Sequence, residues 1–186
     1  MRPIALFAAV AAVLAVPAAA ALAPGAKAPN FTAEGAVAGK PFTVSLAAAL
    51  KKGPVVLYFF PAAFTGGCNA EAHAFAEAID DFKAQGATVI GMTAGNVDRI
   101  VEFSADTKLC SGKFAVAAAT PAVISAYDVL LKKPDGTPTN ITSRTSFVIA
   151  PGGKILFVHS DMNPADHIRL TLDAVRKYRV AHKRRA

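Results

Sequence analysis

Cys68 is the residue in this sequence whose type and setting point most directly to chemistry. It follows an apolar run at residues 54–60, PVVLYFF, which predicts a strand that is covered on both faces of a sheet. After a short loop, apolar residues recur at Phe75, Ile79 and Phe82, the spacing of a helix with one buried stripe. Cys68 is therefore expected near the first turn of a helix, where unpaired N–H groups and the helix dipole favour a thiolate over a thiol. The pattern predicts a nucleophilic cysteine, with a small buried hydrophobe as the alternative.

The loop before Cys68 has features that suit a reactive sulfur. Gly66 and Gly67 let the backbone approach a small ligand closely, and Thr65 places a hydroxyl three residues upstream of the cysteine. Pro61 ends the apolar run. The loop is therefore the expected place for a substrate to meet the sulfur.

These residues resemble the active-site signature of peroxiredoxins of the AhpC/TSA type. Residues 61–68, PAAFTGGC, match a proline, three residues, a threonine, two residues and the peroxidatic cysteine, and Glu71 stands where that family commonly has a glutamate. Residues 25–31 resemble the opening G-x-x-A-P-D-F with Asn for Asp, and residues 144–155 resemble an R-x-x-F-x-I strand and the turn after it. Residues 159–164, HSDMNP, are similar to the peroxiredoxin Q (bacterioferritin comigratory protein) branch. The resemblance runs in order over roughly residues 25–180.

The resemblance implies a mechanism and its residues. The Cys68 thiolate would attack the O–O bond of hydrogen peroxide or an organic hydroperoxide and become a sulfenic acid. Arg144 and the helix start would supply positive potential, and Arg144 and Thr65 would hydrogen-bond the departing oxygen. Pro61 and Phe64 would shield the sulfenate. Glu71 has two open readings, either orienting an arginine or favouring the helix N-terminus.

Cys110 is the second cysteine, 42 residues after Cys68. In an exported chain two cysteines commonly indicate a structural disulfide, but a permanently bonded Cys68 could not attack peroxide. Some peroxiredoxin Q members carry a resolving cysteine five residues after the first, where this sequence has His73, and others carry it on the next helix. The resemblance therefore implies that Cys110 resolves the Cys68 sulfenic acid and that a thioredoxin-like or other thiol reductant regenerates the enzyme. The alternative is a one-cysteine enzyme with a buried Cys110.

The rest of the chain is predicted to form an α/β layered sheet. Turn residues bound strand-like segments at 31–32, 39–44, 55–60, 87–92, 114–117, 146–150 and 154–159. Helical patterns occupy 45–50, 67–84, 97–109, 121–127 and 167–180, and 132–142 is expected to be a polar loop. The family implies a thioredoxin-like fold, with a central mixed sheet flanked by helices.

The first 20 residues are predicted to be a signal peptide. Arg2 gives a positive start, residues 4–16 are apolar, and small residues follow at 17–20. The run of 13 residues is shorter than the roughly 20 that a membrane span needs, although a retained anchor is the alternative. We expect residues 21–186 to form one domain, exported to a bacterial periplasm or similar space, without stable membrane insertion after cleavage. Losing Arg2 lowers the formal net charge from +7 to +6.

The sequence predicts no metal and no cofactor. His73, His159, His167 and His182 lack the spacing of metal ligands, and no phosphate-cradling motif is present. The basic residues from 176 to 185 are interpreted as a solvated tail rather than a nucleic-acid interface.

Three classes of function are considered, and a thiol peroxidase is preferred. An exported thiol–disulfide oxidoreductase of the same fold would need C-x-x-C, but position 71 is Glu. A binding module without catalysis would not need Thr65, Cys68 and Arg144 together. We expect a monomer or a weak homodimer.

Overall fold

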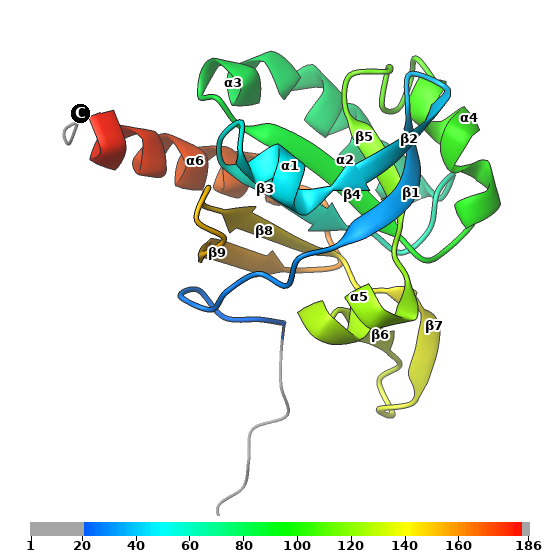
Figure 1. The fold of residues 1–186 in the computed structure, drawn as a ribbon. Coiled ribbons are helices and arrows are strands. Elements are labelled where there is room, and N and C mark those ends of the chain that lie inside the picture. The colour runs from blue at the N-terminus through cyan, green and yellow to red at the C-terminus, as the bar shows by residue number, and fades with distance from the viewer. Residues whose placement is uncertain (1–20, 184–186) are drawn as a thin grey trace, which may run out of the picture.

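The computed structural model describes residues 21–183, and its centre is one mixed seven-stranded sheet of order β2-β1-β5-β4-β3-β8-β9 (Figure 1). The strands of this sheet are β1 (Thr32–Val37), β2 (Lys40–Ser45), β3 (Val55–Phe59), β4 (Thr88–Thr93), β5 (Ala115–Ala118), β8 (Thr145–Ile149) and β9 (Ile155–Ser160). The helices are α1 (Leu46–Leu50), α2 (Gly66–Glu77), α3 (Ile79–Ala84), η1 (Val97–Arg99), α4 (Ile100–Ala105), α5 (Pro121–Tyr127) and α6 (His167–Lys183). This confirms the α/β class.

Strand β3 lies inside the sheet, between two neighbours of opposite direction. It pairs in parallel with β4 and antiparallel with β8. All five residues of β3 are buried, as expected for a strand that is covered on both faces. The carboxyl end of β3 therefore lies beside the amino end of β8, a pairing that matters for the site.

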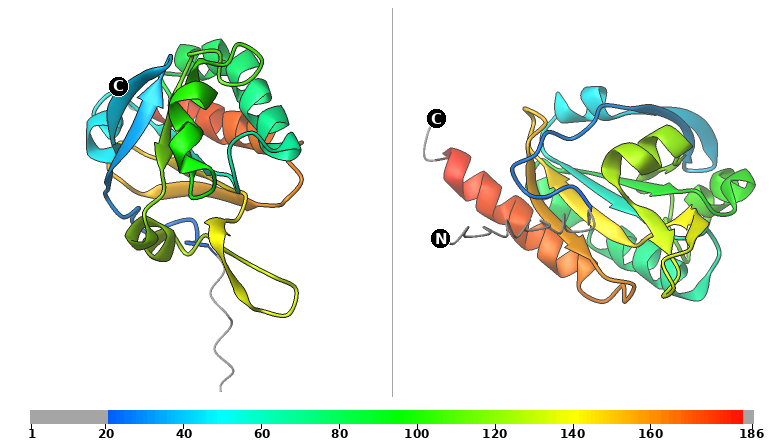
Figure 2. Two further views of the ribbon diagram at one scale, coloured as in Figure 1. Left: turned by 90° about the vertical axis from the view of Figure 1, so that its right-hand side faces the viewer. Right: turned by 90° about the horizontal axis from the view of Figure 1, so that it is seen from below.

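Helices cover both faces of the sheet, and alternate residues of β3 point into two separate cores. Val56, Tyr58 and Phe60 pack with side chains from α2, α3, α4 and α6. Val55, Leu57 and Phe59 pack with side chains from α1 and α5. Figure 2 shows α1 and α5 on one side of the sheet and α2 and α6 on the other. The predicted thioredoxin-like architecture is thus confirmed as two layers of helices around a mixed sheet.

The predicted helix at 67–84 is interrupted, and the structure corrects it. A break at Ala78 separates α2 from α3, and Ala78 has φ −85° and ψ 0°. Asp80 and Asp81 lie in the first turn of α3, where carboxylates stabilise a helix N-terminus. Both pieces still face one core, because the rings of Phe75 and Phe82 are 5.9 Å apart.

The predicted helix at 97–109 is also wrong at its end, because α4 stops at Ala105. Asp106 leaves the helical conformation with ψ 120°, and its carboxylate accepts a hydrogen bond of 2.8 Å from the Lys108 N–H. The Asp106 carbonyl accepts from the N–H groups of Leu109 and Ser111. A side chain that bonds nearby backbone competes with helix propagation. Cys110 consequently lies in a turn, five residues beyond α4.

Residues 132–142 were expected to be a loop, but much of this segment is paired. Strands β6 (Leu130–Lys132) and β7 (Pro138–Thr142) form a separate two-stranded antiparallel sheet. The Thr139 hydroxyl donates a 2.7 Å hydrogen bond to the Leu131 carbonyl. Residues 134–137, PDGT, form the turn, which makes the segment a hairpin.

The C-terminal basic residues are partly held against the protein. Arg176 on α6 lies 3.8 Å from Asp81 and 3.6 Å from Asp173, and Arg179 donates to the Gln85 carbonyl. The helix continues three residues past the predicted end at 180. Up to Lys183, the basic segment that was predicted to be a solvated tail is therefore the end of α6.

The predicted signal peptide at residues 1–20 lies outside the described residues. Within residues 21–183, no helix has both the length and the apolar character that a membrane crossing requires.

Candidate active site

The loop between β3 and α2 places Cys68 as the third residue of α2, with 2% of its surface exposed. Phe64 adopts a left-handed conformation with φ 60°, which is uncommon outside glycine and turns the chain sharply into the helix. The Thr65 hydroxyl donates to the Ala62 carbonyl at 2.9 Å, and the Thr65 carbonyl accepts from the Asn69 N–H at 2.8 Å. The loop and the first helical turn are therefore fixed together.

The same loop is tied to the end of β4. The Thr93 hydroxyl donates to the Pro61 carbonyl at 3.0 Å, and the Asn96 side chain donates to the Ala63 carbonyl at 2.7 Å. Pro61 is buried and Thr65 is exposed. The predicted residues Pro61 and Thr65 thus lie in the loop that precedes Cys68, and the Thr65 hydroxyl donates to the Ala62 carbonyl.

Arg144 reaches Cys68 because of how β8 pairs with β3. Phe59 is opposite Thr145, so the residue before β8 lies at the carboxyl end of β3, where the active-site loop begins. The Thr142 hydroxyl donates to the Phe60 carbonyl at 2.6 Å and holds the approach to β8 in place. The Arg144 guanidinium is buried, and its Nη2 lies 3.6 Å from the Cys68 sulfur.

Gly67 leaves the space that the Arg144 guanidinium occupies. A Cβ at position 67 would lie 3.1 Å from Arg144 Nη2, which is tighter than ordinary packing. A side chain at this position would push the guanidinium from the sulfur.

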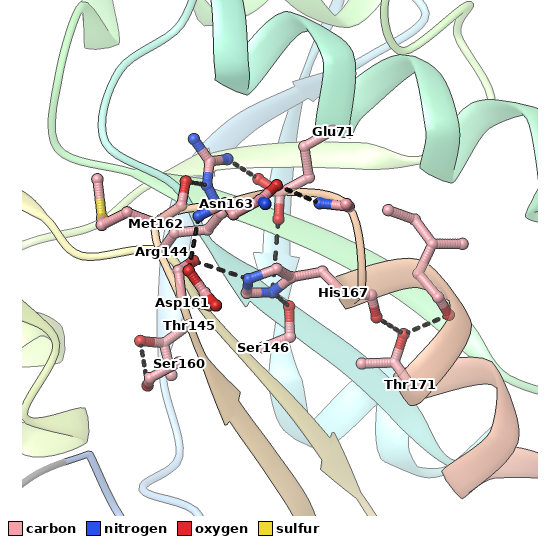
Figure 3. A network of polar contacts seen from close by, with 12 residues as sticks. Glu71, Arg144, Thr145, Ser146, Ser160, Asp161, Met162, Asn163, His167 and Thr171 are labelled. Carbon is pink, nitrogen blue, oxygen red and sulfur yellow. Dashed lines mark hydrogen bonds and ion pairs between the residues drawn. The ribbon is translucent and has the colours of Figure 1, made fainter.

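The remaining nitrogens of Arg144 are also bonded. Nε donates to the Met162 carbonyl at 3.0 Å, and Nη1 donates to Oε2 of Glu71 in a buried ion pair (Figure 3). Burial raises the pKa of Glu71 to about 7, although the charge and hydrogen bond of Arg144 act to lower it. Glu71 therefore orients an arginine, which settles the two readings left open by the sequence.

His167 extends this polar network beyond the residues that the sequence singled out. It is fully buried at the start of α6, where its ring bonds the Ser146 hydroxyl and the Asp161 carbonyl. Burial lowers the pKa of His167 to about 4. Ser146 has a signal in the sequence, because it is two residues after Arg144 on a strand and so shares its face. Nothing in the spacing of His167 connects it to Cys68.

The exposed rim of the site is aromatic and basic. Phe64 is half-buried, and its ring packs edge-on against Phe103 at 5.2 Å. The Arg99 guanidinium lies 3.8 Å from the centre of the Phe64 ring, a cation–π contact. Phe64, which belongs to the loop before Cys68, is therefore held by contacts with Phe103 and Arg99.

Cys110 shares the core of Cys68 but not its polar partners. Both cysteines are free, and both belong to the core on the α2 side of the sheet. Burial, followed by the Asp106 carboxylate, raises the pKa of the Cys110 thiol. The structure thus brings Arg144 and Glu71 to Cys68 and leaves Cys110 as a separate buried thiol in the turn after α4.

Between residues 21 and 183, no three or more His, Cys, Asp and Glu side chains cluster as metal ligands would.

The fold and this geometry define a class: a thioredoxin-like protein with a cysteine at the start of a helix and an arginine at its sulfur. Residues 24–158 match the model of the AhpC/TSA family, and the chain belongs to that family. The resemblance to peroxiredoxins is thereby confirmed.

The chain is similar to curated and solved peroxiredoxins. It is 30% identical to the chloroplastic peroxiredoxin Q of Oryza sativa subsp. japonica over 80% of this chain and 64% of that protein. It is 29% identical to a peroxiredoxin of Mycobacterium tuberculosis over 79% of this chain and 90% of the relative. The crystal structure of peroxidoxin BcpB from Mycobacterium tuberculosis has a TM-score of 0.69 and 25% identity, and the alignment covers 83% of this chain and 96% of that one. The chain spans 64% of the length of the rice relative.

Proposed function

We propose that this protein is a thiol-dependent peroxidase that reduces hydrogen peroxide and organic hydroperoxides through a Cys68 sulfenic acid. The observation that carries the proposal is the Arg144 guanidinium 3.6 Å from the Cys68 sulfur, in a helix N-terminal turn. A cation and the helix dipole both favour the thiolate. Membership of the AhpC/TSA family supports the same chemistry.

The proposed reaction forms an S–O bond and breaks the O–O bond. The Cys68 thiolate donates an electron pair to the terminal oxygen of the peroxide, the sulfur is oxidised, and the remaining oxygen leaves as water or an alcohol after taking a proton. Arg144 is placed to stabilise the negative charge that develops on the oxygens. Pro61 and Phe64 would limit the access of water. Because the Thr65 hydroxyl donates its proton to the Ala62 carbonyl, its oxygen would accept from the peroxide O–H rather than donate to the departing oxygen.

Peroxide consumption by the reduced protein tests this proposal directly. Cys68→Ser should abolish consumption because it removes the nucleophile, whereas Cys110→Ser should still consume about one equivalent. Circular dichroism of both variants controls for folding. Full turnover by Cys68→Ser would remove the peroxidase assignment.

We also propose that Cys110 resolves the sulfenic acid. Its sulfur would attack Cys68, form an S–S bond and release the oxygen as water. The two cysteines share one core, but the Cys110 thiol is fully buried, so the turn after α4 or the first turn of α2 must open. Peptide mapping after one equivalent of peroxide should find a Cys68–Cys110 disulfide within one chain. A lasting Cys68 sulfenic acid beside a free Cys110 would instead indicate a one-cysteine enzyme.

The reductant is proposed to be a thioredoxin-like protein or another thiol. The exported thiol–disulfide oxidoreductase is the alternative, but position 71, where a C-x-x-C motif would place its second cysteine, holds the buried Glu71. Restoration of peroxide turnover by candidate thiols distinguishes these functions, because an oxidoreductase would exchange disulfides without consuming peroxide.

Export and assembly complete the proposal. We propose cleavage near residue 20 and work in a periplasm-like space, on the basis of the apolar N-terminus. N-terminal sequencing of the cellular protein should begin after the signal, and an intact Met1 would contradict it. Analytical ultracentrifugation should find a monomer or a weak homodimer.

A further inference from the structure

The ion pair of Glu71 and Arg144 continues into a buried polar cluster that the proposed reaction does not use (Figure 3). The cluster joins α2, β8, the segment after β9 and the start of α6. Glu71, Ser146 and His167 in this cluster are each 0% exposed. Buried polar groups are costly unless each donor and acceptor has a partner, so the positions of the protons can be argued from the contacts.

One ring nitrogen of His167 has a fixed role. Nε2 lies 2.9 Å from the Asp161 carbonyl oxygen, which can only accept, so Nε2 carries a proton and donates it. When His167 is neutral, Nδ1 is therefore unprotonated. It can then accept from the Ser146 hydroxyl, 2.8 Å away.

The same Nδ1 also faces Glu71. Oε1 of Glu71 lies 3.6 Å from it and, within residues 21–183, has no hydrogen-bond partner, whereas Oε2 accepts from Arg144. If Glu71 is ionised and His167 is neutral, a carboxylate oxygen and an unprotonated ring nitrogen lie 3.6 Å apart in a buried site. One proton at this contact, on either atom, would remove the repulsion between them and, with a small approach of the two side chains, would give Oε1 a partner.

We propose that Glu71 and His167 share one proton at this contact. His167 is thereby a positioning residue for peroxide reduction at Cys68, and this second step rests on the proposed peroxidase function. With the proton bound, the Glu71–His167 pair is neutral, and the charge of Arg144 is left for the Cys68 thiolate. Without it, the carboxylate neutralises Arg144, and the buried thiolate becomes an uncompensated charge.

The direction of both titrations agrees with this arrangement. Burial raises the pKa of Glu71 to about 7 and lowers the pKa of His167 to about 4, so the neutral forms of both groups are favoured. The contact therefore holds its proton below about pH 7 and loses it as the pH rises through that value. The other titratable or charged groups that face the pair are Arg144 before β8, Cys68 on α2, Tyr58 on β3, His159 on β9, and Asp161 and Asp166 before α6.

A double-mutant cycle tests the shared proton without using peroxide. In a Cys110→Ser background, the rate of Cys68 alkylation by iodoacetamide is measured against pH for His167→Gln, Glu71→Gln and the double variant. Glutamine at 167 can donate to the Glu71 carboxylate but cannot accept its proton at the same contact, so it stabilises the ionised carboxylate and lowers the pKa of Glu71. We expect the midpoint of alkylation to rise by about one pH unit, which is roughly tenfold less thiolate below the midpoint.

The diagnostic result is the behaviour in the second background. With Glu71→Gln the site no longer has the carboxylate, so adding His167→Gln should leave the midpoint unchanged. An equal shift in both backgrounds would mean that His167 only supports the fold, and the proposal would be wrong. Alkylation needs only a thiolate, so this test can be interpreted even if the protein shows no peroxidase activity.

NMR of the otherwise unaltered chain gives a second, independent test. Nitrogen-15 shifts of His167 and the carboxyl carbon-13 shift of Glu71 are followed from about pH 5 to about pH 9. We expect Nε2 to stay protonated, Nδ1 and the Glu71 carboxyl to respond together, and their midpoint to move in Cys68→Ser. An ionised Glu71 with an unchanging Nδ1 throughout would overturn the proposal.

Discussion

Cys68 and Cys110 are almost equally buried, with 2% and 0% of their surfaces exposed, yet their electrostatic surroundings are opposite. Cys68 lies in the first turn of α2, with a guanidinium at its sulfur. Cys110 lies in a turn after α4, where burial and then the carboxylate of Asp106 raise the thiol pKa. The depth of burial therefore does not distinguish the two thiols, whereas the charge beside each one does.

The two cysteines also differ in their backbone supports. The turn around Cys110 depends on Ser111 and Gly112, which have φ of 52° and 66°. The start of α2 carries Gly66, which is helical and has open space around it. Position 112 therefore requires a conformation that favours glycine, whereas position 66 does not; the left-handed residue before α2 is Phe64, with φ 60°.

The largest expected effect comes from removing the guanidinium at Cys68. Arg144→Ala should slow peroxide reduction by about 100-fold or more, in line with losing about 2–4 kcal/mol of transition-state stabilisation. The matched control is Arg99→Ala, which removes the exposed guanidinium over Phe64 and should change the rate less than about threefold. Stopped-flow kinetics measure both rates. Arg144→Lys keeps the positive charge and serves as a second variant in case Arg144→Ala does not fold. Equal rates for Arg144→Ala and the parent would place the essential cation elsewhere.

An intermediate effect is expected in the pH dependence of thiol alkylation. Because its pKa is raised, the Cys110 thiol stays protonated at neutral pH and should react only as the solution becomes alkaline. In single-cysteine variants, Cys68 should react at least about tenfold faster at pH 7. Asp106→Asn should make the alkylation rate of Cys110 slightly more like that of Cys68, because it removes a negative charge that raises the pKa of the Cys110 thiol. Mass spectrometry of quenched samples gives the alkylation rates. Comparable rates for the two cysteines in the folded protein would contradict the proposed difference in their electrostatic surroundings.

The smallest effect is expected in stability, from one alanine on each side of the comparison. Gly112→Ala must adopt φ 66° and place its Cβ 3.0 Å from the Ala38 Cβ, so it should lower the free energy of unfolding by about 1–3 kcal/mol. Gly66→Ala meets nothing within 4 Å in a helix and should raise it by about 0.5–1 kcal/mol. Urea denaturation at equal m-values measures both changes. Losses of the same size would show that the two backbones are equally constrained.

The sequence by itself determined the elements around Cys68. Residues 55–59 form a buried strand as their continuous apolar character predicted, and Cys68 lies in the first turn of a helix. Helix α5 begins and ends where predicted, because Thr120 caps it and Pro121 suits its first turn. Such features depend on neighbouring residues, so periodicity and capping reveal them.

Only the tertiary structure decided which distant groups surround the sulfur. Arg144 is 76 residues from Cys68 and reaches it because β8 pairs antiparallel with β3, a register that no local pattern specifies. Glu71 is an ion-pair partner rather than a helix-end charge for the same reason. His167 enters the site because α6 packs against the face of the sheet that carries Ser146. These contacts depend on long-range pairing and burial, which bring charged and polar groups to the Cys68 sulfur.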